Sequence, residues 1–425
     1  MPPFNRRDFL GSSLGGLAAA CSLGPGLLSS LAGCAQSADA AGAAELSPST
    51  LFLTWQRDPT TTMTIQWVAS ETASDKSVQY KPFEKGVAQI AKTITKPFPN
   101  TDLKVHRCEL TGLLPGTEYT FQIGGGSTAY RFRTMPAKAT NTIQWVSGGD
   151  SGVDSHAIGT NIMAANQEPH FALIGGDLAY DNGRAPETFR KFLENYNRHM
   201  VDPQRRLVPL VSCLGNHEVD GGYKGDRSKS PQYLSVFDGF YSETTYGVLD
   251  FGDYMSLVLL DTDHIAPIPG EQTSWLESTL AARQDRDHLI VANHVPAYPS
   301  YRNPQGADGK LGTGEENRLH WCPLFERYSV DLVLEHHDHT FKRTHPLAGG
   351  QVDRNGVLYL GDGSWGKIRA PQTPEQRSYL AAVSESYHMS VHRLEGRQRF
   401  HVALEESGKV ADVCMTSSKR PARRG

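Results

Sequence analysis

The pattern of apolar residues changes once along this chain, near Asn141. Before it, apolar stretches are short, rich in β-branched and aromatic residues, and separated by turn residues, as in LFLTWQ, MTIQWVA and EYTFQIG. After it, apolar runs alternate with segments of helical periodicity such as PETFRKFLENYNRHM. Short strands with turns indicate an all-β fold, whereas strands that alternate with helices indicate an α/β fold. The chain is therefore predicted to contain two domains of different classes.

The first domain is predicted to span residues 49–136. In LLPGTEY (113–119), a Leu, a Pro and Tyr119 have the spacing of a tyrosine corner, in which the tyrosine hydroxyl bonds to the backbone just upstream. This corner is typical of immunoglobulin-like and fibronectin type III-like sandwiches. We expect such an all-β sandwich, followed by a linker, PAKATN (136–141), and then by the α/β domain at 142–405.

The N-terminus is predicted to be an export signal rather than part of the fold. Arg6 and Arg7 precede a weakly apolar, Gly-rich stretch, which is the pattern of a twin-arginine signal. We expect residues 1–34 to be the signal and residues 35–48 to be a tether. The protein is then expected in the periplasm or at the cell surface.

Two cleavage sites are compatible with this signal. LAGC ends at Cys34 and resembles the site at which a bacterial lipoprotein is cleaved and its cysteine acylated. The alternative is cleavage after Ala40, since ADA (38–40) has the A-x-A form of an ordinary signal. We favour the lipid anchor at Cys34. It would be the only attachment to a membrane, because no other stretch reaches the roughly 18 apolar residues of a membrane-spanning helix.

Composition restricts the partners and cross-links of the chain. A net charge of −4 gives no general attraction to nucleic acid, and the basic segment 406–425 is expected to be a disordered tail. The six cysteines are widely spaced and form no CxxC pair, which argues against a zinc–thiolate site. An exported protein can form disulfides, although their pairing does not follow from the sequence. The oligomeric state is equally open.

Polar residues follow five of the apolar runs in the second domain. In α/β folds ligands bind at the carboxyl ends of strands, so these five loops can converge on one site. Carboxylates, a phenol, an amide and imidazoles are all metal ligands, and the predicted site is therefore a metal centre. The residues are Asp150 in DSG, Asp177 and Tyr180 in GDLAY, Asn216, His217 and Glu218 in GNHE, His294 in VANH, and His336, His337, Asp338 and His339 in HHDH.

These blocks, in this order, resemble those of the calcineurin-like metallophosphoesterases, and within them the purple acid phosphatases. The resemblance spans roughly residues 145–365, and the preceding sandwich also fits the larger members of the family. It implies an α/β (α+β) catalytic domain of two β-sheets flanked by helices. It also implies two metal ions, Fe(III) together with Fe(II), Zn or Mn, and Tyr180 is the residue that favours the purple enzymes.

The resemblance divides the predicted ligands into two sets that share one carboxylate. Asp177 would bridge the metals. Because His337 and His339 are two apart, their side chains would point to opposite sides of an extended segment, so the chain must turn there to bring both to the site. The ferric ion would be bound by the hard oxygen donors and one imidazole of Asp150, Tyr180 and His339, and the divalent ion by Asn216, His294 and His337.

The implied activity is that of an exported phosphatase that hydrolyses phosphate monoesters of small molecules by attack of a metal-bound hydroxide. His217 would stabilise the transition state or protonate the leaving group, and Glu218 would orient it. His264 and His336 are further candidates for the pocket wall. The family usually has Gly where this chain has His336, which predicts either backbone strain or an added pocket group. Asp338 is expected to be structural.

Two other functions stay open. A phosphodiesterase or nucleotidase on the same two-metal core is the main alternative, because the pocket walls that separate these activities do not show in the sequence. A remote alternative is a surface binding protein with an inactive metal fold. An inactive fold would be expected to have lost ligands, and all seven predicted ligands are present.

Overall fold

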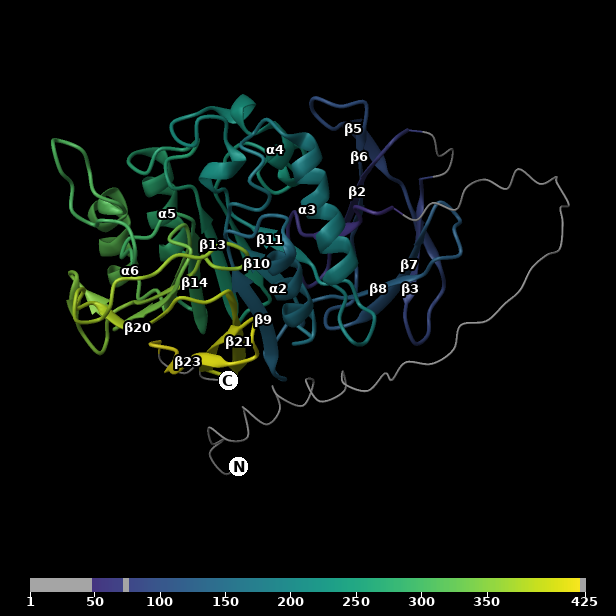
Figure 1. Cartoon of the computed structure of the whole chain (residues 1–425). Helices are drawn as coiled ribbons and strands as arrows, with labels where there is room; N and C mark the ends of the chain where they lie inside the picture. Colours follow the sequence, from purple (N-terminus) through teal and green to yellow (C-terminus); the bar gives the residue numbers. More distant parts are fainter. Residues whose placement is uncertain (1–47, 72–75, 421–425) are drawn as a thin grey trace, which may run out of the picture.

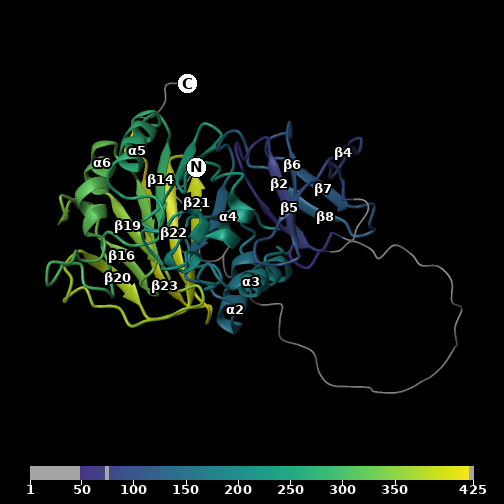
Figure 2. The ribbon, with the colours of Figure 1, turned by 90° about the horizontal axis from the view of Figure 1, so that it is seen from above.

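The computed structural model describes residues 48–71 and 76–420, which form a β-sandwich packed beside a larger layered domain (Figures 1 and 2). The predicted signal, the tether up to residue 47 and the cleavage sites at Cys34 and Ala40 lie outside the described residues. In the described ranges, no helix combines the length and apolar character needed to cross a membrane. The cysteines of these ranges, Cys108, Cys213, Cys322 and Cys414, are all unpaired.

The first domain consists of two four-stranded antiparallel sheets in its described part, with strand orders β1-β2-β6-β5 and β4-β3-β7-β8. Leu114 N donates to the hydroxyl of Tyr119 at 2.9 Å, so the predicted tyrosine corner is confirmed, as is the all-β class of this domain. The strands are β1 (Phe52–Thr54), β2 (Met63–Ala69), β3 (Val78–Pro82), β4 (Gln89–Ala91), β5 (Ile94–Pro97), β6 (Lys104–Leu110), β7 (Glu118–Ile123) and β8 (Tyr130–Arg133).

The second domain contains two larger mixed sheets. The six-stranded sheet has the order β11-β10-β9-β21-β22-β23, and the seven-stranded sheet has the order β12-β13-β14-β15-β19-β16-β20. Its strands are β9 (Ile143–Gly148), β10 (Ala172–Ile174), β11 (Leu210–Ser212), β12 (Gly247–Phe251), β13 (Met255–Leu260), β14 (His288–Asn293), β15 (Leu332–Glu335), β16 (Phe341–Thr344), β19 (Leu358–Asp362), β20 (Leu380–Ser384), β21 (His388–Glu395), β22 (Gln398–Glu405) and β23 (Val410–Ser417), with a small pair β17 (Leu347–Ala348) and β18 (Gln351–Val352).

Helices flank these sheets, with α2 and α3 beside the six-stranded sheet and α5 and α6 beside the seven-stranded sheet (Figures 1 and 2). The α-helices are α2 (Ser155–Ala165), α3 (Pro186–His199), α4 (Pro231–Phe237), α5 (Glu271–Ala281) and α6 (Cys322–Arg327). Shorter helical turns are η1 (Asn216–Glu218), η2 (Arg227–Lys229) and η3 (Asn317–Trp321).

The continuous apolar runs of the second domain are strands buried on both faces. Along β13, Leu257 and Leu259 belong to the core between the two sheets, whereas Val258 and Leu260 pack with α5 and α6 on the outer face. β14 alternates in the same way. Because successive side chains of a strand point to opposite faces, a strand covered on both sides needs apolar residues at every position. The predicted α/β class, with two sheets flanked by helices, is confirmed.

The sandwich shares its core with the second domain. Trp55 of the first domain packs edge-on against Phe171 and Phe251, with ring centroids 6.0 Å apart in both pairs. Arg107 contributes an ion pair to Asp238, just beyond the end of α4. Aromatic pairs of this geometry add about 0.5–1.5 kcal/mol each to the burial of their area. The sandwich is therefore packed against the second domain through a shared apolar core.

The C-terminal segment corrects one prediction. A disordered tail was expected from residue 406, but Val410–Ser417 forms β23, which pairs with β22 at the edge of the six-stranded sheet. Beyond it, the guanidinium of Arg420 lies 2.5 Å from Asp331, a buried carboxylate that also contacts Arg399 at 3.1 Å. The basic residues of this segment predicted a solvated end, whereas the buried Asp331 binds one of them, Arg420, in an ion pair. The residues after 420 lie outside the described part.

His288, at the start of β14, is buried in its neutral form. Its Nε2–H donates to Gly396 O at 2.8 Å, and its Nδ1 accepts from Arg399 Nη1 at 3.0 Å. Burial, and then the positive charge of Arg399, lower the pKa of His288 to about 4. The unfolded chain, in which histidine has an ordinary pKa of about 6.5, therefore binds a proton earlier than the folded protein as the pH falls.

This difference predicts an acid-sensitive stability. Above about pH 6.5, His288 is neutral in both states and does not lower the free energy of unfolding. As the pH falls from 6.5 towards 4, the unfolded chain gains a proton that the folded protein does not, and the free energy of unfolding decreases. Between pH 7 and 5 this decrease is about 2 kcal/mol. We expect His288→Gln and His288→Asn to be less stable than the wild type at pH 7, and to lose less stability on going to pH 5. Chemical unfolding at the two pH values measures this. An unchanged pH dependence in both variants would contradict it.

Candidate metal centre

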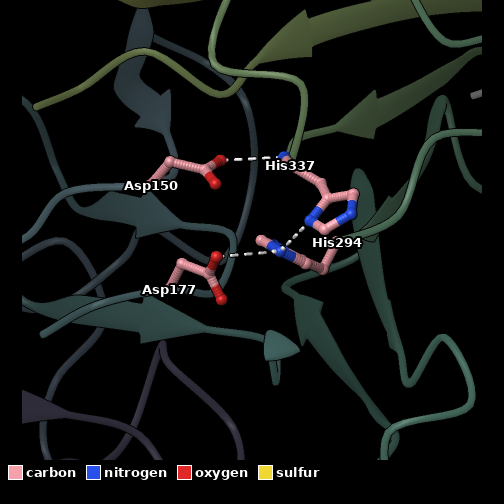
Figure 3. Close-up of side chains that lie close together, drawn as sticks. All are labelled: Asp150, Asp177, His294 and His337. Carbon is pink, nitrogen blue, oxygen red and sulfur yellow. Dashed lines mark hydrogen bonds and ion pairs between the residues drawn. The ribbon is translucent and has the colours of Figure 1, made fainter. Parts of the chain in front are cut away.

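The polar loops of both sheets meet at one place. Asp150 follows β9 and Asp177 follows β10 of the six-stranded sheet, while His294 follows β14 and His337 follows β15 of the seven-stranded sheet. Figure 3 shows the two carboxylates facing the two imidazoles. One ligand atom from each of these four residues lies within 4.8 Å of the others. The backbone N–H of His337 also donates to Asp150 Oδ2 at 2.8 Å, which joins the two sheets at the centre.

Asp150, Tyr180 and His339 form the first set of facing atoms. The hydroxyl of Tyr180 lies 3.3 Å from Asp150 Oδ1 and 3.1 Å from His339 Nε2, and the last two atoms are 2.9 Å apart. Burial, and then the charge of Asp150, hold the pKa of Tyr180 well above its ordinary value. A phenolate at this position therefore needs a cation beside its oxygen.

Asn216, His294 and His337 form the second set. His294 Nε2 lies 3.2 Å from Asn216 Oδ1 and 3.1 Å from His337 Nδ1. Asp177 joins this set, because its Oδ2 is 3.3 Å from the same His294 Nε2, and its Oδ1 accepts the backbone N–H of His217 at 2.8 Å. The structure thus brings together all seven predicted ligands, in the two groups that the resemblance implied.

Metal ions fit the donor atoms that meet here. Asp177 Oδ2 is buried and, within the described residues, accepts no hydrogen bond. Burial opposes ionisation of Asp177, but the facing imidazoles, His294 first, hold its pKa well below the ordinary value. A buried carboxylate with a free lone pair is costly unless positive charge lies beside it. Oxygen and nitrogen donors that converge around such an atom are suited to first-row transition metals.

Left-handed backbone is concentrated at these ligands. Non-glycine residues rarely adopt a positive φ, and such residues persist only where the surrounding structure holds them. The turn predicted between the two C-terminal histidines is present, since both have a positive φ. The values are 58° for Asp150, 55° for Asp177, 60° for Tyr180, 71° for His337 and 59° for His339.

His336 is neither strained nor placed beside a substrate. It is absent from the residues with positive φ, and its side chain is buried behind the ligands. A Cβ added to Gly149 would lie 2.7 Å from His336 Nδ1, and one added to Gly175 would lie 1.8 Å from Nε2. The imidazole therefore fills a slot that only these two glycines leave open. Both predicted roles of His336 are wrong, because its ring packs between two strand ends.

Glu218 binds the loop of Asp177 and does not orient His217. Its carboxylate accepts the backbone N–H groups of Asp177 at 2.8 Å, Leu178 at 2.7 Å and Gly215 at 2.8 Å. Burial, and then the charge of Asp177, raise the pKa of Glu218 to about 8, while the backbone donors favour its ionised form. The role expected for Glu218 is corrected accordingly: it fixes the loop that carries the central ligand.

The imidazole of His217 points its Nε2 towards the centre. Its Nδ1 lies 2.5 Å from Asn182 Oδ1, and its Nε2 lies 3.9 Å from Asp177 Oδ2. The side chain is 34% exposed, so it remains accessible to a substrate. Burial is the main cause that lowers its pKa. Asn182, two residues after Tyr180 in the same loop, is the orienting residue that the sequence did not single out.

His264 and Asp338 support the centre from outside it. His264 is fully buried, donates from Nδ1 to Gly222 O at 2.9 Å, and has its ring 5.6 Å from that of His294. Burial, and then the charge of His294, lower the pKa of His264 to about 3, so it is a neutral packing group rather than a pocket wall. Asp338 accepts from Tyr301 N at 2.7 Å, away from the centre, as its structural interpretation requires.

Known proteins resemble this chain in sequence and in structure. Residues 48–134 match the model of the purple acid phosphatase N-terminal domain, and residues 153–341 match that of the calcineurin-like phosphoesterases. Human acid phosphatase type 7 is 26% identical over 415 residues, which cover 87% of this chain and 91% of that protein. Purple acid phosphatase 21 of Arabidopsis thaliana is 23% identical, over 80% of this chain and 77% of that protein.

Other matches are partial or more distant. An uncharacterized Mycobacterium tuberculosis protein is 27% identical over 70% of this chain, and the match covers 62% of that protein, less than two thirds of its length. The structure of purple acid phosphatase PPD1 from yellow lupin has a TM-score of 0.72 at 19% identity and covers 87% of this chain and 74% of its own. The two family matches together cover well over half of the chain. The second domain is therefore that of a calcineurin-like phosphoesterase, and it is preceded by the N-terminal domain of the purple acid phosphatases.

Proposed function

We propose that this chain is a two-metal phosphatase that hydrolyses phosphate monoesters of small molecules. The observation that carries this proposal is the arrangement of seven donor residues in two facing sets, with Asp177 beside both. The family of the chain and its named relatives agree with a metal-dependent phosphoesterase.

The two sets suit different ions. Asp150, Tyr180 and His339 would hold a ferric ion, because carboxylate and phenolate oxygens are hard donors. Asn216, His294 and His337 offer an amide oxygen and two imidazoles, which suit Fe(II), Zn or Mn. When bound, such ions neutralise phosphate charge and make a water nucleophilic near neutral pH. Asp177 would contact both ions, with its loop fixed by the three hydrogen bonds to Glu218.

His217 is the side chain outside the donor sets that is placed to contact a substrate. Asn182 fixes one edge of its ring, so Nε2 is left to meet a phosphoryl or leaving-group oxygen. The ring of Tyr180, 4.3 Å away between centroids, limits its movement on one side. A positioned imidazole of this kind can exchange a proton with the departing oxygen.

Export and anchoring belong to the same proposal. Arg6 and Arg7 support the twin-arginine route, and LAGC ending at Cys34 supports a lipid anchor. If both hold, cell fractionation finds the protein in the membrane fraction, and Cys34→Ala releases it. A soluble wild-type protein would instead support cleavage after Ala40.

The monoester proposal is tested with a panel of phosphate monoesters, diesters, nucleotides and phytate across pH. We expect a higher kcat/KM for small monoesters than for diesters at every pH tested. A preference for diesters or for nucleotides would assign the same centre to a phosphodiesterase or a nucleotidase. The absence of hydrolysis in a chain that binds two metals would leave the binding-protein hypothesis.

A further inference from the structure

The two imidazoles of the divalent set are held at their outer nitrogens by different groups. His294 Nδ1 lies 2.9 Å from the carbonyl oxygen of Gly175, a backbone partner. His337 Nε2 lies 3.2 Å from the hydroxyl of Tyr223, a side-chain partner. An imidazole whose inner nitrogen faces a metal carries its proton on the outer nitrogen, so Nε2–H of His337 donates to Tyr223. Such outer hydrogen bonds fix the ring and raise its basicity as a ligand.

Tyr223 reaches His337 from a loop that is itself fixed. The loop follows η1, beside the six-stranded sheet. Its backbone is hydrogen-bonded to the segment after β13 of the seven-stranded sheet. Lys224 N donates to Asp263 O at 2.8 Å, and the ring of Tyr223 packs on that of His264 with centroids 4.9 Å apart. The hydroxyl thus has a defined position although the side chain is 42% exposed.

The contact between Tyr223 and His337 lies at the wall of a cleft. Tyr223 and His337 both line a cleft of about 310 Å³ that continues along residues 311–317. Without the hydroxyl, the outer nitrogen of His337 would lose the hydrogen bond that fixes this edge of the ring and would face the cleft instead. His294, whose partner is a backbone carbonyl, has no comparable freedom, and none of the three residues of the ferric set contacts Tyr223 in the described structure.

We propose that Tyr223 is a positioning residue that fixes the ring of His337 and thereby sets the affinity of the divalent half of the centre for its metal. This role rests on the metal-binding part of the proposed function and not on the choice of substrate. Tyr223 lies in GGYKGD, shortly after GNHE, and no local pattern there marks it. Its contact exists only because the loop crosses from one sheet to the other.

The test is Tyr223→Phe, which removes one oxygen atom and keeps the ring. Metal-free full-length protein is titrated with Zn²⁺ alone, by calorimetry or in competition with a chelator. We expect the affinity for one of two Zn²⁺ ions to fall by about 10–100-fold and the affinity for the other to stay unchanged. Because the ligands remain, a saturating metal concentration is expected to restore kcat.

Tyr328→Phe is the matched control, since it removes a tyrosine hydroxyl that contacts Glu277 at 3.3 Å and no residue of the centre. It should bind both ions as the wild type does. Wild-type affinity for both ions in Tyr223→Phe, or equal weakening of both, would overturn the assignment. A wild-type chain that binds two ions but hydrolyses no ester would reject the proposed function alone, because the titration does not depend on turnover.

Discussion

Replacing Asp177 with asparagine is expected to abolish metal loading and phosphoester hydrolysis together. Asparagine keeps the volume and the oxygen that accepts the His217 N–H. It replaces Oδ2, the buried oxygen that faces His294, with an uncharged N–H donor. The variant therefore removes the charge and the Oδ2 acceptor of Asp177 while it keeps the size of the side chain. Loss of the metals should lower hydrolysis by more than about 10⁴-fold, which corresponds to over about 5 kcal/mol of transition-state stabilisation.

Asp181→Asn is the matched control for this prediction. Asp181 is a buried carboxyl four residues further along the same loop, and burial raises its pKa to about 7. The same change of carboxyl to amide there should leave both metals bound. Elemental analysis and steady-state kinetics on the two variants separate the outcomes. Normal metal content in Asp177→Asn would show that this carboxylate does not hold the metals.

His217→Ala is expected to keep both metals and to lower kcat by about 10²–10⁴-fold, the usual scale for a lost acid–base group. The imidazole belongs to neither donor set, and the backbone N–H that positions Asp177 remains in alanine. Asn182→Ala should cause a smaller loss, because it frees the ring without removing it. Metal analysis beside the kinetics is essential here. An unchanged kcat, or a loss of metal, would remove His217 from the proposed chemistry.

The residues that meet at the centre could be predicted from sequence because they lie in short local blocks. Each of the five blocks that contain these residues follows an apolar run, and such runs become strands whose carboxyl ends meet at one edge of each sheet. The two-residue spacing of His337 and His339 also required a turn, and both have a positive φ. The division into a phenolate set and an imidazole set came from the family resemblance, and the contact distances agree with it.

The supporting residues could not be predicted because their roles depend on packing between distant segments. Glu218 is next to His217 in sequence, yet its carboxylate turns back to the Asp177 loop. His336 was expected at the pocket, but Gly149 and Gly175, from two strand ends of the other sheet, provide its slot. The end of the C-terminal segment likewise has a partner that is distant in the sequence, because Arg420, just beyond β23, forms an ion pair with Asp331.

The positive φ angles at the predicted ligands explain why the surrounding contacts are needed. Several non-glycine ligands have a positive φ, a conformation that costs on the order of 1 kcal/mol or more each. The surrounding hydrogen bonds, such as those of Glu218 to the Asp177 loop, offset that cost. The packed sandwich extends the same support outward through Trp55. These contacts therefore hold the donor atoms in their strained positions.

Metal content and activity, measured on the same preparation, show whether these residues form a working two-metal centre. The full-length protein is analysed for metals and assayed on a phosphate monoester, then stripped with a chelator, assayed again, and reloaded with iron and with zinc or manganese. We predict two metal ions per chain, loss of hydrolysis when they are removed, and recovery when they are returned. Full hydrolysis by the metal-free protein, or a chain that binds no metal at these residues, would show that the centre is not a two-metal phosphatase site.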